Sequence, residues 1–274
     1  MDVLPKLVDS MLSFENHILT LTFNRDDVRN ALTGTHIVDD IVQTITWANA
    51  CKDVAVMIIT GTGSVFSSGG NVKDMANRQG DFSGNVSELE LRYRQGIQRL
   101  PLMMEQAEMP VIAAVNGAAI GAGFDLANMC DLRVASNKAK FGETFINLGL
   151  IPGDGGAWFM QRLIGYQKAA ELTMTGRIID AQEAKELGIV LKIVEPDSLL
   201  AEANTLALEM ANKPAAALRL TKRLMKMAQR TQLPDFLEIC AAFQGMAHQE
   251  PDHLRAVSQL IDKMNKPSSK PYKK

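Results

Sequence analysis

Two glycine-rich segments, residues 66–71 and 116–123, have the composition of tight turns that expose backbone N–H groups. Each follows an apolar run that predicts a buried strand, residues 54–60 and 111–115 respectively, and each leads into a helix-like stretch. Glycine lets the backbone turn sharply and approach a ligand closely, because it carries no Cβ. Two such turns can direct two N–H groups at one developing oxyanion, and losing one donor can cost about 100- to 1000-fold in rate. The spacing therefore predicts an oxyanion hole built from both turns.

Four segments resemble, in order, the motifs of the crotonase (enoyl-CoA hydratase/isomerase) superfamily. They correspond to an N-terminal turn, two oxyanion segments and a catalytic loop, and they lie at residues 24–32, 66–75, 114–131 and 141–156. The resemblance implies an acyl-CoA-processing enzyme that stabilises a thioester enolate, in fatty-acid or related acyl-CoA metabolism. Coenzyme A would enter as part of the substrate, with no separate cofactor. The family also implies a homotrimer or a dimer of trimers.

The same resemblance implies an α/β fold in two parts. Residues 1–200 are expected to form a crotonase-like spiral of ββα repeats, residues 201–266 a C-terminal helical trimerisation region, and residues 267–274 a disordered tail. The residues themselves support this class, since apolar strand-like runs alternate with helix-like stretches, which indicates parallel strands with helical crossovers. One helix is expected over residues 88–107, and a mobile polar loop that could act as a lid over residues 77–86.

By position in the family motif, the two oxyanion donors would be the backbone N–H groups of Gly70 and Ala122. Neither role needs a side chain, so glycine and alanine both satisfy it. A helix is expected to begin near Gly121, and the positive end of its dipole would then face the developing enolate.

A hydratase of this family uses two glutamates to hold and activate water, and this chain departs from that pattern. Asp125 stands at the first position and Phe145 at the second, where a phenyl ring cannot transfer a proton. Two other carboxylates are near in sequence, Glu143 and Asp154. In some family members with other reactions, an acid at or near the loop position of Asp154 is the base or nucleophile, which makes Asp154 the leading candidate for proton transfer. Burial in an apolar pocket would raise its pKa toward the working pH, as a general base requires.

Each carboxylate also has a structural interpretation. Asp154 precedes a helix-like stretch, where an aspartate is a favourable N-cap. Asp125 could be a first-turn acid favoured by the helix dipole, and Glu143 a solvated or structural residue. The apolar wall of the site is expected to come from three aromatic residues, Phe124, Phe145 and Trp158.

Three cations could meet the phosphates of coenzyme A. Arg25 and Arg29 lie in the N-terminal turn, and Lys73 follows the first glycine-rich segment. Each could equally be a solvated surface charge. The resemblance also implies that the backbone around Val28 and Ser68 meets the adenine end of coenzyme A. It implies that four further residues line the pantetheine arm: Gly70, Asn71, Val72 and Lys73.

The composition limits the partners. The chain has 274 residues and a net charge of −2 at pH 7, so its overall charge does not favour polyanions. Its three cysteines, Cys51, Cys130 and Cys240, lack metal-ligand spacing, and an odd number argues against a disulfide framework. No metal site is expected. The N-terminal residues resemble neither a signal peptide nor a membrane span, so a cytoplasmic location is expected.

Three reactions remain open within the family: double-bond isomerisation, water addition to a 2-enoyl-CoA, and hydrolysis of a thioester or of a β-dicarbonyl C–C bond. Isomerisation needs one mobile base, whereas hydration normally needs two acids. A non-catalytic acyl-CoA-binding or RNA-binding relative is a further alternative, since residues 219–230 carry five basic side chains on an expected helix. A solvated helix face explains that stretch better, because charge is balanced elsewhere in the chain.

Overall fold

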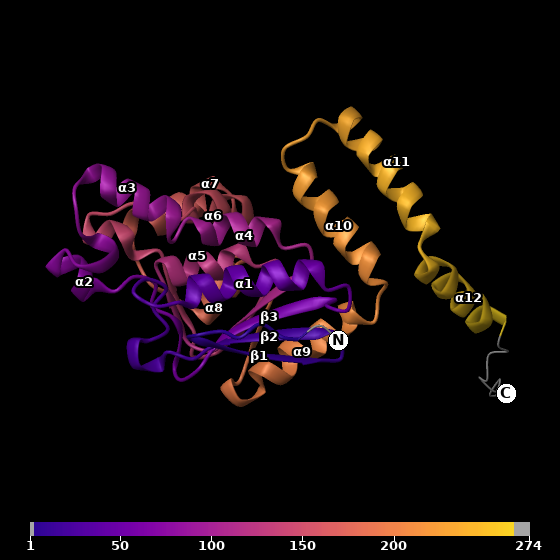
Figure 1. Ribbon diagram of the computed structural model, residues 1–274, viewed down its shortest axis with the longest axis horizontal. Helices are drawn as coiled ribbons and strands as arrows, with labels where there is room; N and C mark the ends of the chain where they lie inside the picture. The colour runs from indigo at the N-terminus through magenta and orange to yellow at the C-terminus, as the bar shows by residue number, and fades with distance from the viewer. Residues whose placement is uncertain (1–2, 266–274) are drawn as a thin grey trace. The chain divides into compact units, whose positions relative to one another are not determined.

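The chain divides into two compact units, residues 1–211 and 212–274, and the computed structural model describes residues 3–265 of them (Figure 1). The first unit contains two sheets. The six-stranded sheet has the order β1(Ser10–Glu15), β2(Ile18–Phe23), β3(Val56–Gly61), β5(Val111–Val115), β7(Leu132–Ser136), β10(Lys192–Val194). The four-stranded sheet has the order β4(Val65–Ser67), β6(Ala118–Ile120), β8(Lys140–Gly142), β9(Ile179–Asp180). β1 pairs antiparallel with β2 and β9 antiparallel with β8, and the other neighbours are parallel.

The chain alternates between the two sheets in successive turns. β3, β5 and β7 of the larger sheet are each followed by a short strand of the smaller sheet, β4, β6 and β8, and then by helical residues. Those helical segments are α2(Val72–Asn77), α5(Ala122–Met129) and the 3₁₀ helix η3(Thr144–Leu148). This pattern confirms the expected spiral of ββα repeats. It also places the turns after β4 and β6 next to each other, because these strands pair directly.

The central strands are covered on both faces. Met57, Ile58 and Ile59 of β3 are fully buried, as expected for a continuous apolar run in a parallel sheet. Figure 1 shows α1(Ile37–Ala50) on one side of β1–β3 and α9(Leu199–Ala211) on the other. α9 packs on β3, β5 and β7 and buries Ala203 and Ala207. The first unit therefore extends through Ala211, past the boundary at residue 200 expected from the sequence.

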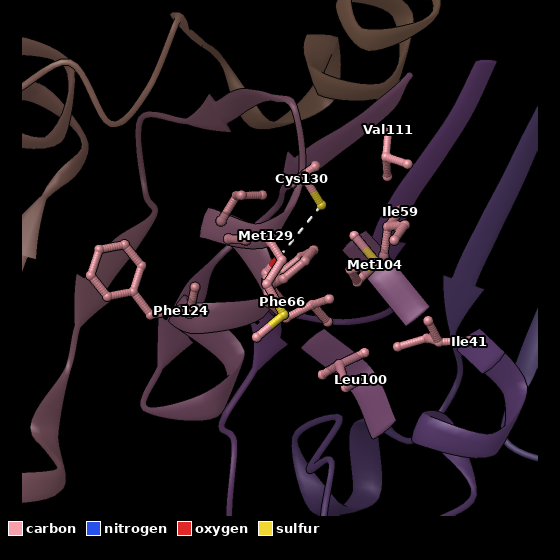
Figure 2. Close-up of a cluster of buried hydrophobic side chains, with 14 of the residues drawn as sticks. Ile41, Ile59, Phe66, Leu100, Met104, Val111, Phe124, Met129 and Cys130 are labelled. Carbon is pink, nitrogen blue, oxygen red and sulfur yellow. Dashed lines mark hydrogen bonds between the residues drawn. The ribbon is translucent and has the colours of Figure 1, made fainter. Parts of the chain in front are cut away.

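The hydrophobic core lies between the larger sheet and its covering helices. Figure 2 shows part of it, with Ile59 of β3 and Val111 of β5 in the same cluster as Leu100 and Met104 of α4(Arg99–Gln106). All four side chains are at most 1% exposed. Burying side chains of this size contributes about 1.5–3 kcal/mol each, so this layer holds the turns that leave the sheet in place.

One sequence expectation about local structure was wrong. The single helix over residues 88–107 is two helices, α3(Val86–Gln95) and α4, because Gly96 adopts φ −103° and ψ −107°, outside the helical region. The polar stretch at residues 77–86 is mainly a connecting segment, and its proposed role as a lid stays a prediction. It contains the 3₁₀ helix η2(Gly80–Phe82) and ends in a capping box, in which Asn85 and Glu88 satisfy the first backbone N–H groups of α3.

Three helices lie between η3 and α9 in the first unit, and the last of them packs on β8, β9 and β10. They are α6(Gly156–Ile164), α7(Tyr166–Thr175) and α8(Ala181–Glu186). The 3₁₀ helix η1(Asp26–Val28) follows β2, and the 3₁₀ helix η4(Pro196–Ser198) precedes α9. The sequence predicted mostly helix from residue 157 onward, and β9 is an additional strand that it did not predict.

The second unit is helical, with α10(Ala215–Ala228), α11(Leu233–Gln249) and α12(Pro251–Asn265). Apolar side chains are exposed along it: Leu233, Leu237, Met246, Leu254, Leu260, Ile261 and Met264. Lys222 is buried and the Arg223 guanidinium lies 5.1 Å from the centroid of the Phe243 ring, so α10 does not present a uniformly solvated basic face. The expected tail at residues 267–274 lies outside the described residues. Across residues 3–265, no helix combines the length and apolar character needed to cross a membrane.

Candidate active site

The two glycine turns contact each other. Gly69 has φ +74°, and a Cβ there would lie 2.6 Å from the Ile120 carbonyl oxygen and 2.9 Å from the Ala122 nitrogen. Gly121 has φ +55°, so both turns use the left-handed region that favours glycine. The Gly69 carbonyl also accepts a hydrogen bond from the Leu32 N–H at 2.7 Å, which fixes the first turn to the segment before α1.

The expected oxyanion donors, Gly70 and Ala122, both line one cavity of about 260 Å³. Ala122 is the first residue of α5, so its N–H has no partner within the helix. In residues 3–265 the Gly70 N–H likewise makes no hydrogen bond to a protein group. Asn71 caps α2 by accepting a hydrogen bond from the Lys73 N–H at 3.0 Å, which orients the chain just after Gly70.

Three buried carboxylates meet behind this cavity. Asp125 comes from α5, Glu143 from the segment after β8, and Asp154 from the loop before α6, and they are 0%, 1% and 3% exposed. A Cβ on Gly156 would collide with both Asp125 Oδ1 and Glu143 Oε1, so these two oxygens share the space beside Gly156. Of the three, Asp154 alone lines the cavity in the described part of the chain.

The carboxylates perturb one another. Burial raises the pKa of Asp125 well above its ordinary value, and the charges of Asp154 and Glu143 raise it further. Burial also raises the pKa values of Glu143 and Asp154, although a hydrogen bond from Thr173 Oγ1 opposes the change at Glu143. A hydrogen bond with Asp125 opposes it at Asp154. Glu143 is therefore neither solvated nor remote, contrary to the interpretation of it as a solvated residue.

Asp154 does not cap a helix. The N-cap of α6 is Gly155, at φ 104°, and no side chain makes a capping hydrogen bond there. Apart from the contact with Asp125, neither Asp154 carboxylate oxygen has a hydrogen-bond partner in residues 3–265. The N-cap interpretation is therefore wrong, and the carboxylate remains available to the cavity.

Tyr93 is a site residue that the sequence did not reveal. It lies on α3 and lines the cavity. Its ring packs against Gly153, where a Cβ atom would lie only 3.2 Å from Tyr93 Cε1. Burial and the charge of Asp154 raise the pKa of Tyr93, so its hydroxyl stays protonated. Sequence reasoning missed it because residues 88–107 read as one uninterrupted helix, with nothing to mark one face as facing the site.

The expected aromatic wall is correct only for Phe145, which lines the cavity. Phe124 instead packs on Phe141 in the core, with ring centroids 5.5 Å apart. Trp158 is 43% exposed, and the guanidinium carbon of Arg162 lies 3.8 Å from the centroid of the Trp158 ring.

The three expected phosphate-binding cations differ in their surroundings. Arg25 donates two hydrogen bonds to Asp27, at 2.8 and 2.9 Å, and one to Asp9 at 3.1 Å, so its guanidinium is already occupied. Arg29 and Lys73 are exposed. Among the other expected contacts, Ser68 donates its N–H to the Arg29 carbonyl at 3.0 Å. Val28 ends η1, and Val72 is exposed at the first turn of α2.

In residues 3–265, no group of three or more His, Cys, Asp or Glu side chains is arranged to hold a metal ion. In residues 3–265 the three cysteines form no disulfide, and two of them, Cys51 and Cys130, are buried.

A spiral of ββα turns, two apposed glycine turns and a buried carboxylate facing the same cavity define the crotonase fold and its site. The enoyl-CoA hydratase/isomerase family model matches residues 13–267, and the chain belongs to this family. Crotonyl-CoA hydratase of Syntrophomonas wolfei is 33% identical over 255 residues, which cover 92% of this chain and 95% of the relative. The 1,2-epoxyphenylacetyl-CoA isomerase of Escherichia coli is 29% identical over 249 residues, covering 91% and 94%. The crystal structure of an enoyl-CoA hydratase from Bacillus anthracis has a TM-score of 0.86 at 30% identity, covering 93% of this chain and 97% of that one.

Proposed function

We propose that the chain is an acyl-CoA enzyme that shifts a double bond by proton transfer next to the thioester. The observation that carries this proposal is the position of Asp154, the one member of the carboxylate cluster that lines the cavity together with Gly70 and Ala122. One mobile base suffices for isomerisation, whereas Phe145 stands where a hydratase of this family has its second glutamate.

In this mechanism the thioester oxygen of a 3-enoyl-CoA accepts hydrogen bonds from the Gly70 and Ala122 N–H groups. The Asp154 carboxylate removes a proton from C2, and the electron pair moves onto the thioester oxygen, which gives a conjugated enolate. The protonated Asp154 then returns the proton to C4 while the oxygen's electrons re-form the carbonyl. The product is the 2-enoyl-CoA, with no atom gained or lost. The positive end of α5 supports the enolate, since Ala122 is the first residue of that helix.

The coenzyme A portion would lie along the first turn. Exposed Arg29 and Lys73 can pair with phosphates, whereas Arg25 is committed to Asp27 and Asp9. The pantetheine arm would then follow residues 70–73 toward Ala122. Exposed apolar residues on α11 and α12 support the expected homotrimer or dimer of trimers, because large apolar patches mark interaction surfaces. Static light scattering of the purified protein tests that assembly, and a monomeric mass would contradict it.

Hydration of a 2-enoyl-CoA is the second candidate, and Tyr93 favours it. A protonated hydroxyl lining the same cavity as Asp154 offers a second proton-bearing group, and two such groups can hold a water between them. Tyr93 would then replace the missing second glutamate.

The two reactions are separated by incubating crotonyl-CoA and a 3-enoyl-CoA with the enzyme in D₂O and following the products by mass spectrometry. Deuterium incorporation with a shifted double bond and no added water supports the isomerase. The mass gain of one water would establish the hydratase instead. Release of free CoA would mean hydrolysis, and no change in either substrate would leave a more specialised acyl group or a non-catalytic binding protein.

A further inference from the structure

The carboxylate cluster holds three acidic groups and no cation. Asp125, Glu143 and Asp154 are buried, and none of them forms an ion pair in residues 3–265. The arginines that line the cavity are held elsewhere, Arg92 by the Ser83 carbonyl and Arg99 by Asp39 at 2.6 Å.

The buried cation nearest in sequence is also committed. Arg133 of β7 donates to the Ala127 and Cys130 carbonyls, at 3.1 and 2.7 Å, which lie at the opposite end of α5 from Asp125. Tyr93 beside Asp154 and Thr173 beside Glu143 are the neutral polar groups that face the cluster. Three carboxylate anions packed together in a dry interior repel one another strongly, so at least one of them must carry a proton.

The hydrogen-bond donors around the cluster leave two candidates for that proton, Asp125 and Asp154. Neither oxygen of Asp125 accepts a hydrogen bond from an N–H or O–H group in residues 3–265, nor does either oxygen of Asp154. Glu143 accepts one, from Thr173 Oγ1, at Oε2. Asp154 lines the cavity, where solvent reaches it, whereas Asp125 is fully buried and shares the space beside Gly156 with Glu143 Oε1. A negative charge is therefore most costly on Asp125, and a proton there also relieves its repulsion with Glu143.

We infer that Asp125 is a protonated positioning residue, which donates a hydrogen bond to Asp154 and thereby keeps the cavity-facing carboxylate in its basic form. Thr173 stabilises Glu143 as the third member of the cluster. Glu143 in turn repels any negative charge on Asp125. The catalytic meaning of this arrangement rests on the proposed role of Asp154 as the base, whereas the location of the proton does not.

The proton itself is observable without any substrate. Infrared spectroscopy of the wild-type protein near neutral pH should show the carbonyl band of a protonated carboxylic acid buried from exchange with solvent. The band should disappear in Asp125→Asn and persist in Asp154→Asn. Absence of the band in the wild type, or its loss in Asp154→Asn alone, would overturn the assignment.

The positioning role is tested by the pH profile of kcat/KM. Asp125→Asn keeps a neutral hydrogen-bond donor of the same shape, so its acid limb should stay at the wild-type position. Asp125→Leu removes the donor, so the acid limb should move to higher pH by about one unit, equivalent to a tenfold change in the protonation equilibrium of Asp154. An acid limb that moves to lower pH in Asp125→Asn would show that Asp125 is ionised in the wild type, and would overturn the inference.

Circular dichroism melting of both variants identifies any loss of folding. If no substrate is turned over by the wild type, the proposed function fails while the infrared measurement still decides where the proton lies.

Discussion

Gly156 and Asp125 are packed so closely that only a glycine fits at the first position of α6. A Cβ there would stand closer to Asp125 Oδ1, and to Glu143 Oε1, than real Cβ atoms approach a neighbour. Gly156 does not have a positive φ, so the requirement comes from the carboxylates and not from the backbone conformation. The start of α6 and the acid cluster are therefore built as one unit.

Gly156→Ala is expected to destabilise the protein by about 1–3 kcal/mol, the usual cost of overpacking, and to lower turnover by displacing the carboxylates. Gly245 in α11 is the matched control, because it is also helical and an added Cβ would meet nothing within 4 Å. Gly245→Ala should instead stabilise by roughly 0.5–1 kcal/mol. Thermal melting and activity of the two variants test this, and equal melting temperatures would contradict the steric argument.

A pH dependence of stability follows from the raised pKa of Asp125. Aspartic acid in the unfolded chain has an ordinary pKa of 3.8, whereas burial and the neighbouring carboxylates raise the pKa of Asp125 in the folded protein and keep it protonated to higher pH. Between these two pKa values the folded state holds one proton more than the unfolded state, so its stability falls as pH rises. The loss is absent in Asp125→Asn, which cannot ionise.

The free energy of unfolding of Asp125→Asn, minus that of the wild type, should therefore grow by about 1.4 kcal/mol per pH unit above about pH 4. This difference in the free energy of unfolding stops growing at the pH where Asp125 ionises in the folded protein. Urea denaturation of both proteins at one protein concentration, from about pH 4.5 to about pH 6.5, measures it. A difference that stays constant would mean that Asp125 ionises in the folded state as readily as in the unfolded state.

Much of this site could be predicted from the sequence because its positions are set by chain order. The apolar runs before each glycine turn predicted β3 and β5, and the resemblance to the family motif assigned Gly70 and Ala122, which both line one cavity. Asp154 was identified from its place in the loop after Phe145.

Other features depend on packing between distant segments, which spacing does not record. Glu143 joins the acid cluster through Gly156 and Thr173, which come from α6 and α7. Tyr93 lines the cavity from α3, and which face of that helix meets the site depends on the packing of distant segments.

The close approach of Gly69 to Ala122 predicts a large effect from a small substitution. A Cβ at residue 69 would push against the Ile120 carbonyl and the Ala122 nitrogen and separate the two proposed oxyanion donors. Gly69→Ala should lower kcat by about 100-fold or more. Gly188 has a similar φ of +83°, with nothing within 4 Å of an added Cβ. Gly188→Ala thus carries the same backbone strain without the clash, and it should retain kcat. Equal kcat losses in both variants would attribute the effect to backbone strain alone.

The cations of the first turn should differ in their effect on coenzyme A binding. Lys73→Met and Arg29→Asn remove exposed charges, and asparagine tolerates the left-handed backbone of residue 29 at φ 56°. Each should raise KM several-fold, and less so at high salt, because exposed charges are screened. Arg25→Met should lower stability instead, since it breaks the hydrogen bonds to Asp27 and Asp9. Steady-state kinetics at two salt concentrations distinguish these outcomes, and an unchanged KM in both Lys73→Met and Arg29→Asn would exclude them from phosphate binding.

Asp154→Asn should abolish turnover and leave acyl-CoA binding intact. The amide preserves the shape of the side chain but cannot accept the proton, and losing a general base typically costs about 100- to 10,000-fold. Asp40→Asn is the matched control, because Asp40 is also buried but accepts hydrogen bonds from the Val8 and Asp9 N–H groups, at 3.0 and 2.9 Å, away from the cavity. That variant should lose stability and retain turnover per folded molecule. Calorimetric titration with the unreactive product and single-turnover kinetics measure both properties. Retained activity in Asp154→Asn would show that another group is the base, for which Asp39 and Asp81 are the other cavity-lining carboxylates.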